Sequence, residues 1–140
     1  MLVATVMMIL SFATSALASD SHTKPCSQQE TRQAEDDVNH LQNWDQVYRS
    51  YRRFSHCDHG AIGESYSTAI GKLLADRWIR FARLATLVKT DKGFQQFVLR
   101  HIAKTLPSDI LDKIKENSQL HCPGRQTRLC RLITKAASIE

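Results

Sequence analysis

Four side chains that can bind metal ions or transfer protons lie close together in residues 56–64. They are His56, Asp58, His59 and Glu64. Imidazole and carboxylate groups bind divalent cations and act as general acids and bases. Their spacing matches neither the H-E-x-x-H pattern of zinc enzymes nor a complete calcium-binding loop. We therefore treat the segment as a candidate binding loop and assign it no metal ligand, no cofactor and no catalytic residue.

The same segment also has a purely structural interpretation. Asp58 is a turn former, and Gly60 can take the positive φ that turns often need. Glu64 is expected in the first turn of the following helix, where the helix dipole favours a negative charge. On this interpretation only His56 and His59 are left without a structural role.

Other serine and histidine side chains have ordinary structural interpretations. The Gly-Glu-Ser run at 63–65 is not a nucleophile elbow, because that motif requires a strand before the serine. Ser67 is expected on a helix surface. His101 falls on the apolar face of a helix at 94–106, which favours a buried, hydrogen-bonded core histidine. His121 is a potential metal ligand only if the fold brings other ligands to it.

Basic residues recur at helical spacing near the C-terminus. They are Arg125, Arg128, Arg131 and Lys135. Positive charges along one face attract an acidic partner. The same spacing suits a solvated helix face whose last cations interact favourably with the helix dipole. No DNA- or RNA-binding motif and no interleaved aromatic residues accompany these cations, so nucleic acid is not expected as a partner.

The four cysteines predict the covalent framework. They are Cys26, Cys57, Cys122 and Cys130. If the chain is exported, an even number indicates two disulfides, with three possible connectivities, and zinc is disfavoured because no C-x-x-C pair exists. One straight helix from Cys26 to Cys57 would separate them by about 45 Å, whereas a disulfide needs Cα atoms within about 7 Å. We therefore favour a break near Asn43 with a Cys26–Cys57 bridge, and a Cys122–Cys130 bridge across a tight turn.

The N-terminus has the features of a secretory signal peptide. Residues 2–10 are almost wholly apolar but too few to span a bilayer, and the A-L-A run at 16–18 matches a signal-peptidase site, although no Lys or Arg precedes it. An uncleaved anchor is the alternative, which the short apolar run disfavours. We expect a signal peptide at 1–18 and a single domain at 19–140, periplasmic or secreted, without a membrane span after cleavage. The mature chain keeps the formal net charge of +5, which suits anionic partners.

The apolar spacing predicts helices throughout the mature chain. From residue 27 to residue 54, apolar residues recur every three or four positions, with a break where Asn43 can cap a second helix. The aromatic residues of this stretch are expected in the core, or in a partner groove if the helix packs loosely. The longest periodic run, 62–88, is one helix or two with a kink near Asp76 to Ile79. Its apolar face is typical of the central helix of a bundle.

Further helices follow the central run. Thr90 is the expected N-cap of the next helix, which Pro107 ends. Ser108 is expected to cap a short helix, and the last helix begins near Gln126. No stretch alternates with period two, so no sheet is expected. The predicted fold class is all-α, a compact bundle of about five to six helices stapled by one or two disulfides.

Three stretches carry a resemblance to known proteins. They are NWDQVYRSYRRFSHCDHGAIGESYSTAIGKLLADRW, FQQFVLRHIAKTL and CPGRQTRLC. Together they resemble small exported proteobacterial proteins of an uncharacterised family, over most of the mature chain. In general class the chain is also similar to periplasmic immunity proteins against type VI secretion amidases. That likeness implies a helical protein that blocks a toxin with a protruding loop, for which 55–63 is the analogous segment, and it transfers no site residue.

Three functional hypotheses follow. The first is a non-enzymatic protein that acts by binding another protein, with an immunity or inhibitor role as its most concrete form. The second is an envelope metal-binding or stress protein that uses His56 and His59. The third is a small envelope hydrolase that uses Glu64 with a histidine. The absence of a recognisable catalytic motif favours the first.

Overall fold

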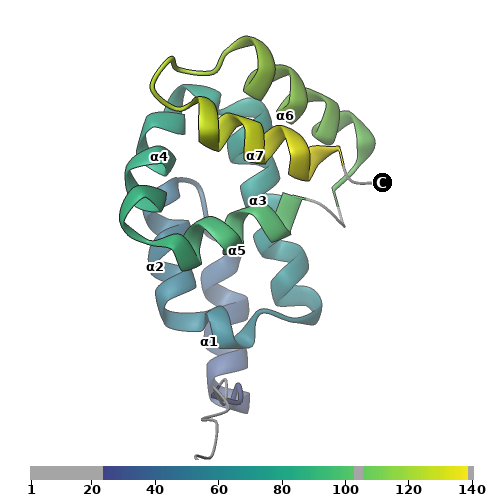
Figure 1. The fold of residues 1–140 in the computed structure, drawn as a ribbon. Coiled ribbons are helices and arrows are strands. Elements are labelled where there is room, and N and C mark those ends of the chain that lie inside the picture. Colours follow the sequence, from purple (N-terminus) through teal and green to yellow (C-terminus); the bar gives the residue numbers. More distant parts are fainter. Residues whose placement is uncertain (1–23, 103–105, 139–140) are drawn as a thin grey trace, which may run out of the picture.

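The computed structural model describes residues 24–102 and 106–138. In these parts the chain forms α-helices and two short 3₁₀ helices, and no strand (Figure 1). The seven α-helices are α1 Gln28–Val38, α2 Trp44–Phe54, α3 Gly60–Asp76, α4 Phe81–Thr90, α5 Lys92–Ile102, α6 Ser108–Leu120 and α7 Thr127–Ala137. The 3₁₀ helices are η1 Ser55–Cys57 and η2 Trp78–Arg80. The predicted signal peptide at 1–18 lies outside the described residues.

The all-α prediction is confirmed, but the prediction of five to six helices was too low. The run at 62–88 forms two helices, α3 and α4, rather than one. α3 ends at Asp76, and Asn117 of α6 closes that end, because its side-chain amide donates to the carbonyls of Leu74 and Ala75 at 2.9 Å each. The backbone then passes through η2, and α4 begins at Phe81. Of the two alternatives for this run, the structure has the kinked one.

α3 lies at the centre of the arrangement. It contacts α1, α2, α5 and α6, and α6 packs in turn on α7. Figure 1 shows α1 and α2 in the lower part of the molecule and α6 and α7 across its upper part. Buried side chains from all seven helices join one hydrophobic cluster. No helix of the described ranges combines the length and the apolar character needed to cross a bilayer.

The chain doubles back between α1 and α2, as the cysteine argument requires. Ser27 and Glu30 form a capping box at the start of α1, and α1 ends at Val38. α2 starts after Asn43, whose side-chain oxygen accepts a hydrogen bond from the Gln46 amide at 3.0 Å. This cap confirms the predicted break. The Cα atoms of the two cysteines that flank the hairpin lie 5.0 Å apart, and their sulfurs form the Cys26–Cys57 disulfide.

The second disulfide also follows the prediction. Cys122 lies in the turn after α6, and Cys130 is the fourth residue of α7. Their Cα atoms are 6.1 Å apart, and the sulfurs are bonded. The bridge fixes the approach of α7 to α6, and both helices contribute buried side chains to the core.

Three helix-boundary predictions were wrong. Thr90 is the last residue of α4 rather than the N-cap of α5. Asp91 takes the capping role, because its Oδ1 accepts a hydrogen bond from the Phe94 amide at 2.9 Å. Ser108 is the first residue of α6, which follows Pro107 without a side-chain cap. Glu64 lies in the second turn of α3, because the helix already begins at residue 60.

Candidate functional site

Asp58 lies in the turn between η1 and α3, and its carboxylate faces α5. Oδ2 accepts a hydrogen bond from the Arg100 guanidinium at 3.0 Å and lies 3.0 Å from Nε2 of His101. The Asp58 side chain is only 8 % exposed. Gly60 follows with a φ of +53°, which lets the chain enter α3 at once. Asp58 therefore shapes the turn and also links it to α5, a contact that its sequence neighbours do not indicate.

His101 joins Asp58 to Ser67 of α3. Its Nδ1 lies 2.9 Å from Oγ of Ser67. In the neutral imidazole, Nε2–H donates to Asp58 and Nδ1 accepts from the Ser67 hydroxyl. His101 is buried and hydrogen-bonded, as predicted. Ser67 is only 5 % exposed, so its expected place on a helix surface was wrong.

The three residues have the composition of a Ser-His-Asp catalytic triad but not its accessibility. A serine nucleophile must reach substrate and lie beside donors that stabilise an oxyanion. Ser67 is buried in the interior of α3, where backbone amides are already used in the helix. The arrangement is suited to holding the 55–60 turn, α3 and α5 together. We call Asp58, Ser67 and His101 the polar chain.

The charge of Asp58 is stabilised in this position. Burial by itself would raise the pKa of the carboxyl group. The hydrogen bonds and electrostatic interactions with His101 and Arg100 outweigh burial, so the net effect holds the pKa of Asp58 below its ordinary value. Asp58 is therefore a carboxylate at neutral pH, and a buried carboxylate without these partners would be strongly destabilising.

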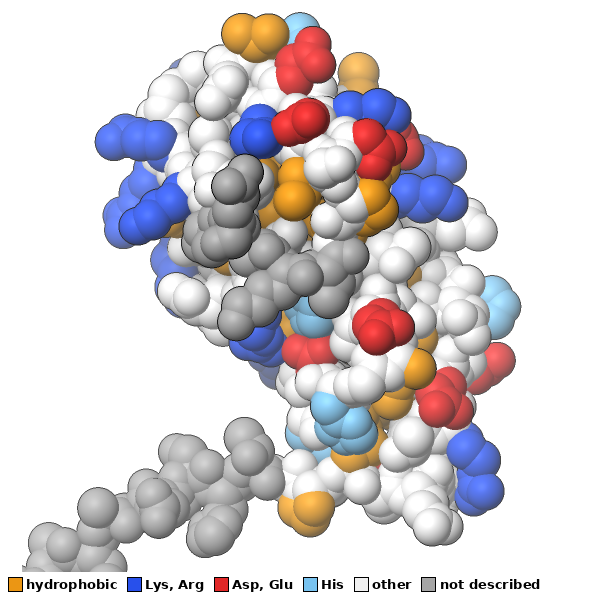
Figure 2. Space-filling model, turned by 90° about the vertical axis from the view of Figure 1, so that its right-hand side faces the viewer, with side chains coloured by type: hydrophobic (Ala, Val, Ile, Leu, Met, Phe, Trp, Pro, Cys, Tyr) orange, Lys and Arg blue, Asp and Glu red, His pale blue; other side chains and the backbone are white. Residues whose placement is uncertain are grey.

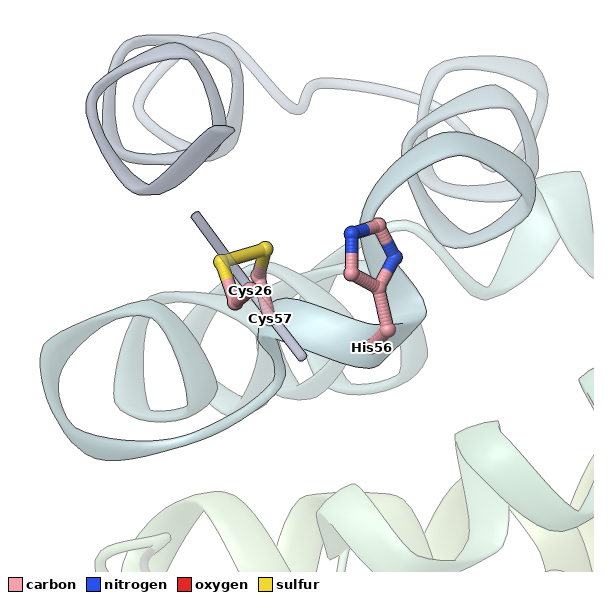
Figure 3. Close-up of side chains that lie close together, drawn as sticks. All are labelled: Cys26, His56 and Cys57. Atoms are coloured by element: carbon pink, nitrogen blue, oxygen red, sulfur yellow. A yellow bond between two sulfur atoms is a disulfide. The ribbon is translucent and has the colours of Figure 1, made fainter. Parts of the chain in front are cut away.

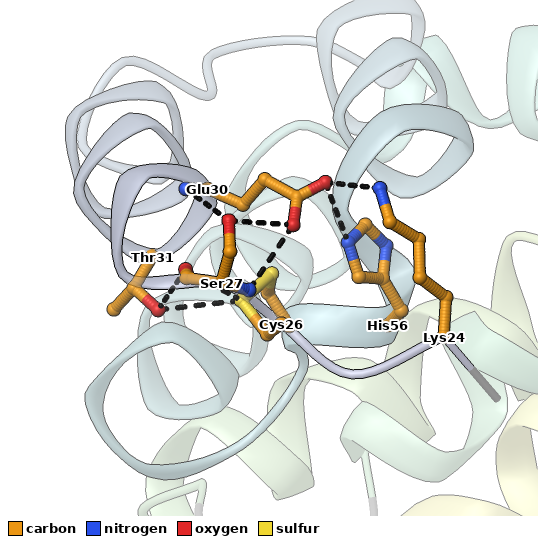
Figure 4. The surroundings of a disulfide bond; sticks show 7 residues. Lys24, Cys26, Ser27, Glu30, Thr31 and His56 are labelled. Atoms are coloured by element: carbon orange, nitrogen blue, oxygen red, sulfur yellow. Dashed lines mark hydrogen bonds and ion pairs between the residues drawn. A yellow bond between two sulfur atoms is a disulfide. The ribbon is translucent and has the colours of Figure 1, made fainter.

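His56 contacts α1 rather than the polar chain. Its Nε2 lies 3.2 Å from Oε1 of Glu30, and Lys24 forms an ion pair with the same carboxylate (Figure 4). The hydrogen bond from Lys24, followed by those from Ser27, lowers the pKa of Glu30 to about 2. Figure 4 shows these side chains grouped beside the Cys26 sulfur. His56 thus has a structural partner at the start of α1.

His59 and Glu64 are exposed and lie outside both groups. His59 immediately precedes α3 and makes no side-chain capping hydrogen bond. The backbone carbonyl of Glu64 accepts a hydrogen bond from the Thr68 hydroxyl at 3.0 Å. The four residues of the candidate binding loop therefore do not converge on one site, since His56 contacts α1 and Asp58 contacts α5.

One group of potential metal ligands lies among the described residues. It consists of Cys26, His56 and Cys57, whose ligand atoms lie within 4.8 Å of one another (Figure 3). The two sulfurs are bonded to each other. Because the thiolate is the form of cysteine that binds metal, this disulfide-bonded group does not offer a metal site. His121 is exposed, and its backbone carbonyl accepts a hydrogen bond from the Trp78 indole.

The predicted basic residues are exposed, and two of them, Arg125 and Arg128, border a groove. The groove has a volume of about 470 Å³ and lies between α4, the start of α5 and α7. Its cationic lining residues are Lys89, Lys92, Arg125 and Arg128, and its apolar lining residues are Ala85, Val88, Leu129 and Leu132. Gln95 and Gln126 complete the lining, and no Asp or Glu belongs to it. We call this feature the basic groove.

The positive surface continues along α7. A second depression of about 270 Å³ shares Arg128 and Leu132 with the basic groove and adds Arg131 and Lys135. Figure 2 shows Lys and Arg side chains gathered along the upper left edge of the molecule. None of these cations forms an ion pair with a carboxylate of the described ranges. The surface therefore has a net positive charge that is not neutralised locally.

Sequence patterns did not indicate two parts of these sites. Lys89 and Lys92 belong to α4 and α5, so only the packing of α7 brings them beside Arg128. The helical spacing of Ser67 and of His101 placed each on its own helix but could not show that these helices meet there. Comparisons with protein-family models, with curated proteins and with solved structures found no match for this chain.

Proposed function

We propose that this chain is a non-enzymatic helical protein that acts by binding another protein, and that the basic groove receives an acidic segment of that partner. The observation that carries the proposal is the composition of the groove. Cations from α4, α5 and the α7 region surround an apolar floor without an acidic residue. Opposite charge steers association and fixes orientation, and the apolar floor supplies area that excludes water.

The apolar floor favours a protein partner over other polyanions. Val88, Leu129 and Leu132 line the groove between the cations, and an acidic helix or extended segment with apolar side chains satisfies both features. Single-stranded nucleic acid is bound by cations together with aromatic side chains on which bases stack. The groove lining contains no aromatic residue. An acidic amphipathic segment is therefore the occupant that matches the lining best.

The proposed location is the periplasm or the extracellular space. Two disulfides support this, because disulfides persist in oxidising compartments. The apolar run and the A-L-A sequence at 16–18 support it independently. An immunity or inhibitor protein is the most concrete form of the proposal. His56 contacts Glu30, whereas His59 and Glu64 are exposed and lie apart from it, so the metal-binding alternative at His56 and His59 and the hydrolase alternative at Glu64 have no specific observation in their favour.

Site-specific photo-crosslinking tests the proposal. A benzoylphenylalanine at Gln95, in the groove, should crosslink a partner protein in periplasmic extract of the native host. The same group at Arg32, an exposed residue of α1, is the matched control and should not crosslink that protein. The captured protein should bind the purified chain, and its contact segment, mapped by mass spectrometry, should be acidic. Equal capture from both positions, or a basic contact segment, would refute the proposal.

A further inference from the structure

Two large hydrophobic side chains are exposed in the described ranges. Ile79 is 94 % exposed and Leu120 is 71 % exposed. Ile79 lies in η2, at the bend between α3 and α4, and Leu120 is the last residue of α6. Single exposed hydrophobic residues are common on protein surfaces. These two differ because the fold brings them to the same end of the molecule.

A hydrogen bond joins the two segments beside these residues. The indole Nε1 of Trp78 donates to the backbone carbonyl of His121 at 2.9 Å. Trp78 immediately precedes Ile79, and His121 immediately follows Leu120. The Trp78 ring stacks on Phe81 of the core, with ring centroids 4.3 Å apart. Trp78 therefore holds together the two segments that carry Ile79 and Leu120. Figure 2 shows hydrophobic side chains at the upper end of the molecule.

The local fold does not require an apolar residue at position 79. The η2 turn closes through a hydrogen bond from the Arg80 amide to the Arg77 carbonyl at 2.9 Å. Trp78 supplies the contacts with the core, so the Ile79 side chain adds none of the packing that positions the turn. An isoleucine held in water forfeits the stabilisation that burial would give. A partner that covers this side chain would recover it.

The charges around Ile79 indicate the chemistry of that partner. A hollow of about 610 Å³ lies beside Ile79 and is lined by residues of α2, η2 and α4, among them Arg49, Arg80 and Arg83. Arg83 is paired with Asp45, its Nε lying 2.9 Å from Oδ1. Arg49 and Arg80 form no ion pair with a carboxylate of residues 24–102 and 106–138. The charge left available beside Ile79 is therefore positive.

We propose that Ile79, Leu120, Arg49 and Arg80 form a second docking surface, for a protein that presents an apolar pocket bordered by carboxylates. Arginine is enriched at protein interfaces, and the fully buried centre of an interface is more apolar than its rim. A second copy of the chain is a poor occupant, because it would bring two sets of unpaired arginines together. The surface shares no lining residue with the basic groove. The inference therefore goes beyond the proposed function and does not depend on the basic groove.

The test uses a benzoylphenylalanine at position 79, with Arg32 again as the control position, in periplasmic extract of the native host. The captured protein is identified, purified and titrated against wild type, Ile79→Ser and Arg80→Glu. We expect a heterologous protein with an acidic contact region, and affinity at least about tenfold weaker for both variants. The Ile79→Ser variant should fold normally, because the Ile79 side chain is almost fully exposed and packs against almost nothing in the fold.

Several results would overturn the inference. One is the absence of a position-specific crosslink at residue 79, and another is unchanged affinity for both variants. Capture of a second copy, with a dimer in light scattering that Ile79→Ser dissolves, would identify the surface as a self-association site. Lys92→Glu, in the basic groove, separates this inference from the proposed function. Its effect reports on the groove alone, whatever Ile79→Ser does.

Discussion

Nε2 of His101 lies 3.0 Å from Oδ2 of Asp58, although the two residues are 43 positions apart in the sequence. This contact fastens the turn after η1 to α5, and Arg100 donates to the same oxygen. The candidate binding loop is thus fixed from within by one of its own acidic residues. The exposed residues of this loop, His59 and Glu64, therefore do not form a site together.

Asp58→Ala should destabilise the fold. The change removes the acceptor for His101 and Arg100 in a largely buried position, and loss of a partner from such a hydrogen bond costs about 1–3 kcal/mol. Urea unfolding at pH 7 measures the effect. Asp36→Ala on the exposed face of α1 is the matched control and should change stability by less than about 0.5 kcal/mol. Equal stability of the two variants would rule out the polar chain as a stabilising element.

The contribution of Asp58 should disappear in acid. Because the folded state holds the pKa of Asp58 below its ordinary value of 3.8, the unfolded state takes up the proton first as the pH falls. The stabilisation is fully present above 3.8 and is lost as the pH falls through the lower, folded-state pKa. The stability difference between wild type and Asp58→Ala should therefore narrow below about pH 4. A difference that is constant from pH 7 to pH 3 would contradict this assignment.

Ser67→Ala should separate a structural role from a catalytic one. The substitution leaves Nδ1 of His101 without its hydroxyl partner in a buried site, so we expect a loss of about 1–2 kcal/mol in the free energy of unfolding. Ser65→Ala, two residues earlier on α3, is the control, with little expected change. Binding of a protein partner at the basic groove should be unaffected by Ser67→Ala at a temperature where both proteins are folded. A loss of binding without a loss of stability would show that the hydroxyl has a different role.

The two disulfides should contribute unequally. In the chain-entropy model, a bridge across a separation of 31 residues stabilises by about 4 kcal/mol and one across 8 residues by about 2.5 kcal/mol. Removing Cys26–Cys57 with paired alanines should therefore lower the urea midpoint more than removing Cys122–Cys130. Cys57 and Cys130 are both buried, so the expected difference rests on the length of the closed loop. The reverse order would indicate that the hairpin of α1 and α2 is held mainly by its other contacts.

The disulfide framework was predictable because covalent geometry limits the choices. A helix between Cys26 and Cys57 had to break if they were bonded, and Asn43 was a suitable cap. The residue preferences of helix N-caps were less informative where two suitable residues are adjacent in the sequence. Thr and Asp are both common N-cap residues, but the structure uses the Asp91 carboxylate, while the Thr90 hydroxyl donates to the Leu87 carbonyl. Propensity could not decide between them, because the outcome depends on where α4 ends.

The sites depended on contacts between helices, which spacing along one helix does not reveal. Ser67 and His101 meet because α3 packs on α5, and the sequence contains no signal for that register. Arg128 was predicted as part of a basic face, but its neighbour Lys92 comes from another helix. The sequence likewise did not indicate that the Ile79 side chain would be exposed. Ile79 lies in η2, between α3 and α4, and the spacing of apolar residues in 62–88 did not show whether its side chain would be buried.

The most direct test of the central claim is the affinity of the captured partner for the Lys92→Glu/Arg128→Glu double variant. Reversing two charges of the basic groove should weaken binding at least about tenfold, which is 1.4 kcal/mol, and the affinity of wild type should fall as salt is raised. Arg32→Glu on α1 changes the net charge in the same direction away from the groove and should leave the affinity within about twofold. Unchanged affinity of the double variant, or an equal loss with Arg32→Glu, would contradict the claim that the groove binds an acidic protein segment.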